Sequence, residues 1–209
     1  MITVKTFVEG PVEANNYLII DEESRDAVLV DCSSARPEFI NAIKAEGVNL
    51  KYILLTHGHF DHLLGVDGFK DVFGVDVYVS KDDESQVKML PDMLRMFGGF
   101  FTAEVPEITS YVKDGDVFEL GNTSIKAIAT PGHTPGGMCY LIDKMLFSGD
   151  TIFYRSIGRC DLPGGDMDTI ANSIKNNLFI LADDIDVYPG HGPKTTIGFE
   201  KKYNDILNY

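Results

Sequence analysis

The chain has 209 residues, of which 44% are hydrophobic and 24% charged, and its formal net charge is −14 at pH 7. These values predict one soluble domain, residues 1–209, and argue against a nucleic-acid partner, because phosphate binding requires basic surface. No stretch reads as a membrane span, and the start of the chain lacks the basic and apolar segments of a signal peptide, so we expect a cytoplasmic protein. The cysteines Cys32, Cys139 and Cys160 form no paired ligand motif and fit a reducing compartment.

Three short β-rich runs open the chain, at residues 3–8, 16–20 and 27–30, and predict a β-meander. Asp31 ends the third run, where it could cap the helix that follows. That helix is predicted over residues 36–46 and should cover the sheet, because its apolar residues share one face.

A dense polar cluster begins where the apolar run 52–55, a predicted buried strand, stops. His57, His59, Asp61 and His62 fall within six positions, and they include three of the five histidines in the chain. Imidazole and carboxylate are natural ligands of a divalent metal, and grouping them without a cation would be costly. His57 and His59 alternate along an extended backbone, whereas Asp61 and His62 come as the chain turns toward a helix. We therefore expect two metal ions; the alternative is a set of solvated loop histidines.

The chain beyond this cluster predicts a helix over residues 63–73 and a strand over 75–79. Residues 81–101 are rich in Met and Phe, which is typical of core or of a dimer face, and alternatively of an adaptable wall of a substrate cleft. A second run of strands is predicted over 108–149, followed by a helix over 167–182, a strand over 186–188 and a helix over 199–207. This order predicts an α/β fold in which two similar halves face each other as a four-layer αββα sandwich.

The other two histidines, His133 and His191, also follow β-like runs, and Asp150 follows the apolar run 145–149. Open α/β sheets place their ligand sites at the carboxyl ends of strands. Glycines beside each of these residues let the backbone turn sharply and approach a ligand closely. We therefore expect all five histidines and these aspartates to share one site.

The pattern HxHxDH at residues 57–62, followed by a distant His, an Asp and a final His, resembles the metallo-β-lactamase fold superfamily over nearly the whole chain. The resemblance implies that one metal is held by His57, His59 and His133, that a second is held by Asp61, His62 and His191, and that Asp150 bridges the two. It also implies that Asp31 lies beneath the metal loop, where a carboxylate can orient a ligating imidazole.

Two such cations would lower the pKa of a shared water toward about 7, so that a bridging hydroxide could attack an ester-like carbonyl at neutral pH. Because the ligands include no thiolate, zinc, iron and manganese all suit the site, and zinc is the ion that we expect.

Residues 156–166 resemble the GRxDLPGGD segment of short, bacterial glyoxalase II-like hydrolases, which cleave S-2-hydroxyacyl glutathione thioesters. The resemblance implies hydrolysis of such a thioester or of a related acyl thiol. Cys160 stands where threonine is common in that group, and a thiol loses most of the hydrogen bonding. Arg159 either pairs with Asp161 to hold the loop or contacts a substrate carboxylate.

Several rival functions share this fold. True β-lactamases are exported and carry arginine where His62 stands, and RNA-processing relatives carry extra domains and basic surface. The main alternative is a persulfide dioxygenase, which shares a GRTD-like segment and uses one iron; residues 162–166 favour the hydrolase. A non-catalytic metal-binding protein would leave Asp61 unexplained.

Longer glyoxalase II enzymes carry a helical carboxyl-terminal domain that helps to hold glutathione, whereas 18 residues follow His191 here. We therefore expect no separate substrate domain and only a modest preference for the thiol half of the substrate. The basic residues of this tail, Lys194, Lys201 and Lys202, are either solvated or in contact with substrate.

Overall fold

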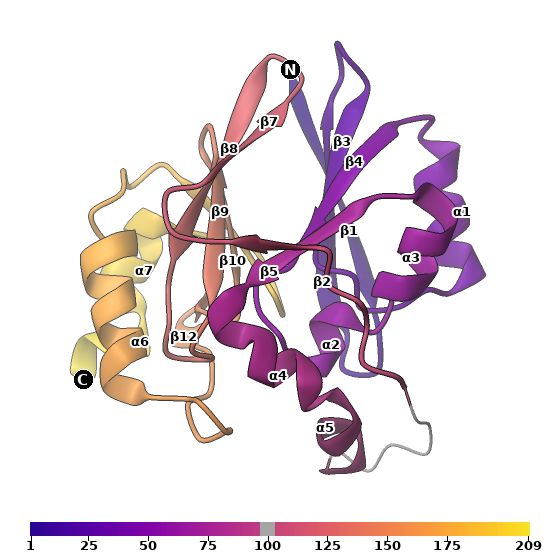
Figure 1. Ribbon diagram of the computed structural model, residues 1–209. Helices are drawn as coiled ribbons and strands as arrows, with labels where there is room; N and C mark the ends of the chain where they lie inside the picture. The colour runs from indigo at the N-terminus through magenta and orange to yellow at the C-terminus, as the bar shows by residue number, and fades with distance from the viewer. Residues whose placement is uncertain (97–102) are drawn as a thin grey trace.

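A computed structural model gives the fold for residues 1–96 and 103–209. Two six-stranded sheets lie face to face, and helices cover the outer side of each (Figure 1). This arrangement is the predicted four-layer αββα sandwich.

The first sheet follows the chain order β1-β2-β3-β4-β5-β6. Its strands are β1 (Ile2–Glu9), β2 (Ala14–Asp21), β3 (Asp26–Val30), β4 (Asn49–Leu54), β5 (Asp76–Ser80) and β6 (Ser110–Val112). The first three strands are the predicted antiparallel meander, and β3 to β6 run parallel. The strands predicted as a second run over residues 108–149 do not all lie in one sheet, because β6 joins the first sheet. Its parallel pairing with β5 is a long-range contact that strand-forming residues do not encode.

The second sheet has the order β14-β13-β10-β9-β8-β7. Its strands are β7 (Val117–Leu120), β8 (Thr123–Ala129), β9 (Met138–Ile142), β10 (Met145–Gly149), β13 (Asp186–Pro189) and β14 (Thr195–Thr196). A separate hairpin is formed by β11 (Ile152–Phe153) and β12 (Ser156–Ile157). The parallel pair β10 and β13 requires a helical crossover between them.

That crossover is α6 (Met167–Ser173), which continues as a π-helix over Ile174–Leu178 and so ends earlier than predicted. The last predicted helix is two pieces, α7 (Ile197–Tyr203) and a 3₁₀ turn over Asp205–Asn208. Asn204 separates them in an extended conformation, and its side chain caps the second piece by accepting from the Ile206 amide.

In the first half, α1 (Pro37–Ala45) lies where it was predicted. The helix expected over residues 63–73 is two helices, α2 (Phe60–Leu63) and α3 (Val66–Phe73). Gly65 separates them where the chain passes so close to Ser34 that an added Cβ would lie 2.2 Å from its carbonyl oxygen. No helix in residues 1–96 and 103–209 is both long and apolar enough to cross a membrane.

The Met-rich and Phe-rich segment begins with a 3₁₀ turn over Lys81–Asp83, followed by α4 (Glu84–Lys88) and α5 (Leu90–Met96). Leu90, Met93 and Leu94 are buried, as expected for core. Residues 97–101 of this segment lie outside the described part, and its use as a dimer face stays a prediction.

Alternation along the strands builds three hydrophobic layers. In β2, Leu18 and Ile20 face α1 and α3, whereas Tyr17 and Ile19 pack between the two sheets. A third cluster, which includes Ile170 of α6, joins the second sheet to its helices. The two sheets are therefore packed as one body, and the loops at their lower edge are held from both halves.

Candidate metal centre

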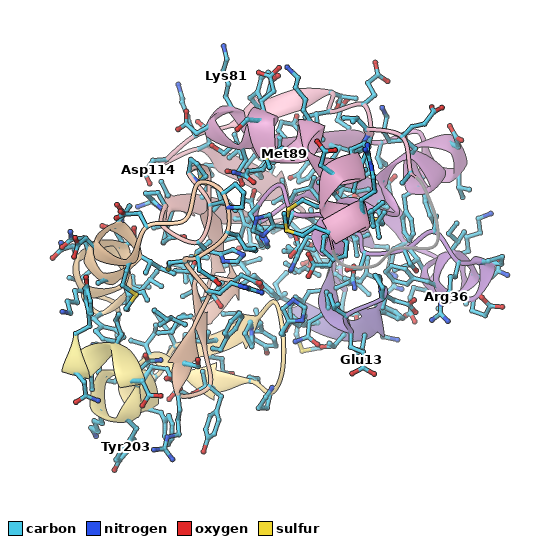
Figure 2. All side chains as sticks on the ribbon, turned by 90° about the horizontal axis from the view of Figure 1, so that it is seen from below. Glu13, Arg36, Lys81, Met89, Asp114 and Tyr203 are labelled. Atoms are coloured by element: carbon cyan, nitrogen blue, oxygen red, sulfur yellow. The ribbon has the colours of Figure 1, made fainter. Side chains whose placement is uncertain are left out.

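The seven candidate ligands come together at one edge of the sandwich. The neighbouring elements α2 and β12 lie in the lower half of Figure 1, and α5 lies below them. In Figure 2, which views this edge from below, Glu13 and Met89 lie over the first half of the fold and Tyr203 over the second. The segment from β4 into α2 carries His57, His59, Asp61 and His62, and the loops after β8, β10 and β13 carry His133, Asp150 and His191. The structure thus brings together every residue that the sequence predicted for the metal site.

Three groups of side chains are close enough to hold a cation, and one of them, His57, His62 and Asp150, takes a histidine from each of the other two. In the first ligand group (His57, His59 and His133), the potential ligand atoms all lie within 4.8 Å of one another. The same limit holds for the second ligand group (Asp61, His62 and His191). Asp150 reaches both groups, with Oδ2 at 3.5 Å from His133 Nε2 and Oδ1 at 3.4 Å from His62 Nε2.

Buried polar atoms without partners show what the site fits. The Nε2 atoms of His57, His59 and His62 and the Oδ1 atom of Asp150 are buried without a hydrogen-bond partner in the described part of the chain. Leaving such atoms unsatisfied is costly, and a divalent cation would satisfy them. The donor set, imidazole nitrogen with carboxylate oxygen, therefore fits bound divalent metals.

The two groups differ in their affinity for protons. Burial and the neighbouring imidazoles lower the pKa of His57 well below its usual value and that of His59 to about 3. Burial acts in the same direction on His62, but nearby carboxylates, led by Asp31, raise its pKa well above the usual value. For Asp150, burial alone would raise the pKa, and the imidazoles, led by His62, lower it overall. His57 and His59 of the first ligand group therefore favour the neutral imidazole, whereas His62 of the second favours the protonated form.

A buried network beneath the motif orients two of the imidazoles. His62 Nδ1 donates to Asp31 Oδ2 at 2.8 Å, because a carboxylate can only accept. Thr56 Oγ1 lies 2.9 Å from the same carboxylate oxygen and 3.0 Å from His57 Nδ1. With both Nδ1 atoms engaged, the Nε2 atoms are left to face the centre. Asp31 therefore acts beneath the loop and is not the cap of α1, whose N-cap residue is Arg36.

Asp83 ties two ligand loops together, although it was not among the predicted site residues. Its fully buried carboxylate accepts the Gly58 amide at 2.8 Å, the Thr134 hydroxyl at 2.8 Å and the Gly136 amide at 2.6 Å. Gly58 stands between the first two histidines of the motif, and the other two residues follow His133 closely. In the sequence Asp83 lies in a short acidic run, which is typical of solvated surface, so no local signal distinguishes it.

A cleft of about 380 Å³ opens onto the site, and five of the seven candidate ligands line it. Apolar side chains form much of the remaining wall: Val12, Phe60, Met93, Phe153, Ile157 and Leu162. Met93 is therefore both part of the core and part of the cleft wall, so the two alternatives for residues 81–101 are combined at this position.

The predicted substrate loop borders the cleft through Arg159. Its guanidinium is paired with Asp161 through two hydrogen bonds. Nε donates to Oδ1 at 2.7 Å, and Nη2 donates to Oδ2 at 2.8 Å. The ion pair is thus present, and contact of Arg159 with a substrate stays a prediction. The Arg159 carbonyl accepts from His133 Nδ1 at 2.7 Å, so the backbone of this loop also orients an imidazole.

Two lysines of the tail have partners on the protein. Lys194 is paired with Asp186 at 2.7 Å and Lys201 with Asp183 at 2.6 Å. Neither of these lysines lines the cleft.

Cys160 stands in the predicted substrate loop, where burial raises the pKa of its thiol. Its Sγ lies 3.4 Å from the Gly158 carbonyl oxygen, so this residue makes a weak substitute for a threonine hydroxyl.

A family model described as the metallo-beta-lactamase superfamily matches residues 10–191. The chain belongs to this superfamily. It is 35% identical to a Haemophilus influenzae protein named hydroxyacylglutathione hydrolase GloC, with 95% of this chain and 96% of the relative covered. The predicted family is thereby confirmed.

Solved structures of superfamily members share the fold at high similarity. The BLEG-1 B3 metallo-beta-lactamase has a TM-score of 0.90 and 33% identity, covering 99% of this chain and all of that one. TTHA1623 in a di-iron-bound form has a TM-score of 0.87 and 32% identity, covering 98% of this chain and all of that one. ETHE1 from Myxococcus xanthus has a TM-score of 0.80 and 26% identity, covering 97% of this chain and 83% of that one. These relatives carry different names, so overall similarity does not separate the reaction classes within the superfamily.

Proposed function

We propose that the protein is a dinuclear metal-dependent hydrolase that cleaves a thioester, either S-2-hydroxyacyl glutathione or a related acyl thiol. In this proposal His57, His59 and His133 hold one divalent ion, Asp61, His62 and His191 hold the other, and Asp150 contacts both. Zinc is the proposed ion, and iron or manganese would suit the same donors. A small-molecule thioester is the proposed partner.

The position of Asp150 between the two ligand groups carries this proposal. One of its oxygens faces His133 of the first ligand group, and the other faces His62 of the second. A single-metal enzyme would need only the first group with a carboxylate. The second group would then have no role, although its members Asp61 and His191 both line the cleft and Asp61 Oδ2 lies 3.2 Å from His191 Nε2.

When bound, such cations supply an ionised water at neutral pH and polarise a carbonyl oxygen. The chain itself holds the imidazoles in place through Asp31, Thr56 and the Arg159 carbonyl. Burial would raise the pKa of Asp61, but His62 and His191 lower it, so this carboxylate stays ionised beside the cleft. The apolar wall limits the water that can compete with the substrate.

The substrate class is supported by the loop between β12 and α6. Leu162 lines the cleft, the Pro163 carbonyl accepts from Gln86 Nε2 at 2.8 Å, and Asp166 caps α6 by accepting from the Thr169 amide at 2.7 Å. The segment that resembles glyoxalase II-like hydrolases is thus built into the wall of the site. The name of the GloC relative points to the same substrate class.

A persulfide dioxygenase with one iron is the second candidate. TTHA1623 in its di-iron-bound form supports iron as a metal for this donor set, and ETHE1 shares the fold. The complete second ligand group favours the hydrolase.

One set of assays on the purified protein tests the proposal. Samples reconstituted with zinc and with iron are given a hydroxyacyl glutathione thioester, a glutathione persulfide and a chromogenic cephalosporin. We expect thioester cleavage without oxygen uptake, and we expect Asp150→Ala to abolish it. Persulfide-dependent oxygen uptake or cephalosporin cleavage, without thioester cleavage, would show that the reaction class is wrong.

A further inference from the structure

The cleft beside the metal centre is enclosed by apolar side chains from both halves of the fold. Val12 comes from the β1–β2 connection, Met93 from α5, Phe153 and Ile157 from the β11–β12 hairpin, and Leu162 from the loop before α6. Val12 is 44% exposed, whereas Phe153, Ile157 and Leu162 are half-buried. Met93 is already buried, so a ligand would gain binding free energy from the other four side chains, in proportion to the apolar area that it covers.

Away from the metal ligands, the same cleft offers few partners to a charged ligand. Among the described residues that line it, Arg159 is the only lysine or arginine, and its guanidinium is already paired with Asp161. The chain as a whole carries a formal charge of −14, which opposes the approach of anions. A glutathione group carries two carboxylates and one ammonium, and each charge that leaves water without a partner raises the free energy of binding.

From these two observations we infer that the cleft selects thioesters whose non-reacting groups are apolar and uncharged, such as medium-chain acyl esters of small neutral thiols. This inference rests on the proposed thioester hydrolysis and makes its substrate class more specific. The apolar group lies against the wall formed by Met93, Phe153 and Leu162 while the thioester carbonyl lies at the metal centre. Glutathione is then a tolerated thiol and not the group that the site recognises.

The test compares thioesters of N-acetylcysteamine whose unbranched acyl chains increase from two to eight carbons. We expect kcat/KM to rise by about fourfold for each methylene that becomes buried and to level off when the wall is covered. The same acyl groups on glutathione should give kcat/KM values within about tenfold of the neutral-thiol series. Non-hydrolysable thioether counterparts are titrated into the protein and followed by calorimetry. Their affinity should rise with chain length in the same order as kcat/KM.

Two variants assign the effect to the cleft wall. Leu162→Ala should reduce the preference for the eight-carbon over the two-carbon chain by about fivefold or more. Leu207→Ala is the matched control, because Leu207 is 43% exposed on the C-terminal 3₁₀ turn and does not line the cleft. Phe153→Ala, on the separate hairpin, tests the same wall should Leu162→Ala fail to fold.

The outcomes separate this inference from the proposed function. Thioester turnover that does not depend on chain length, or a glutathione ester preferred by more than about tenfold, would overturn the inference and leave the hydrolase intact. Thioethers that bind in order of chain length, without turnover of any thioester, would support the apolar cleft and overturn the proposed reaction.

Discussion

Asp31 Oδ2 lies 2.8 Å from His62 Nδ1, and both side chains are buried completely or nearly so. Asp31 has φ of 62°, in the left-handed region that few residues other than glycine adopt. Its carboxylate also accepts the Thr56 amide at 2.8 Å. The hydrogen bonds from Thr56 and His62, one to each carboxylate oxygen, therefore hold Asp31 in this backbone conformation. The strain at the end of β3 thus coincides with the residue that aims an imidazole at the metal centre.

Asp31→Asn should weaken metal binding at the second ligand group by about 10- to 100-fold. Asparagine keeps the shape and tolerates the left-handed backbone, but its amide NH₂ would face a donor, either the Thr56 amide or His62 Nδ1. Competition with a chelator of known affinity measures the change. Asp143→Asn is the matched control, because Asp143 is an exposed aspartate with φ of 50° in the β9–β10 turn. Unchanged metal affinity in Asp31→Asn would show that the carboxylate does not orient His62.

Asp83→Asn should weaken metal binding at the first ligand group by roughly tenfold, because the Gly58 and Gly136 amides can no longer both be accepted. The buried donor left without a partner should also lower the free energy of unfolding by about 1–3 kcal/mol. Asp82→Asn, at the exposed neighbouring position, serves as the control. A purely structural role for Asp83 predicts lower stability with full metal affinity, and that result would contradict the account.

Asp150→Ala should remove both metals and nearly all activity, whereas Asp61→Ala should mainly empty the second ligand group. A carboxylate between two cations offsets their mutual repulsion, so its loss affects both. The ion pairs of Asp61 in the described part of the chain are with His62 and His191 of its own group. Metal content per chain, measured on each variant, tests the assignment. Equal losses from the two variants would mean that the bridging and terminal aspartates are wrongly assigned.

The metal of the second ligand group should be released first as the pH falls. Carboxylates raise the pKa of His62 and, despite its burial, that of His191, so protons compete for these nitrogens near neutral pH. The pKa of His59 is lowered to about 3, so protons compete there only in strong acid. Dialysis at stepwise pH from about 8 to about 4, with metal content and thioester turnover measured at each step, should show two separate losses. Simultaneous release, or turnover that is constant to about pH 4, would count against this difference between the groups.

The grouping of the seven candidate ligands was predictable because its signals are local. The HxHxDH pattern follows one strand directly, and His133, Asp150 and His191 each follow another. Because ligand sites gather at the carboxyl ends of strands, these residues can be assigned to one edge before the order of the strands is established. Asp83 could not be predicted, because its role comes from hydrogen bonds to Gly58 and Gly136, which are 25 and 53 positions away.

The predicted helix boundaries were wrong where tertiary contacts override the preference of the residues for a helix. The predicted helix after the motif is interrupted at Gly65, where the chain packs against Ser34, and the last helix is interrupted at Asn204, whose amide donates to Phe153 and Ser156 carbonyls. Likewise, the residues of β6 predict a strand but do not specify its place beside β5. Such contacts join distant parts of the chain and leave no periodic pattern.

The most direct test of the dinuclear hydrolase is the metal content of the protein purified without added metal, measured on the same sample as thioester turnover. A dinuclear hydrolase should contain two divalent ions per chain and should lose hydrolysis when a chelator removes them and regain it when they are returned. One iron per chain, with persulfide-dependent oxygen uptake and no thioester hydrolysis, would contradict this function.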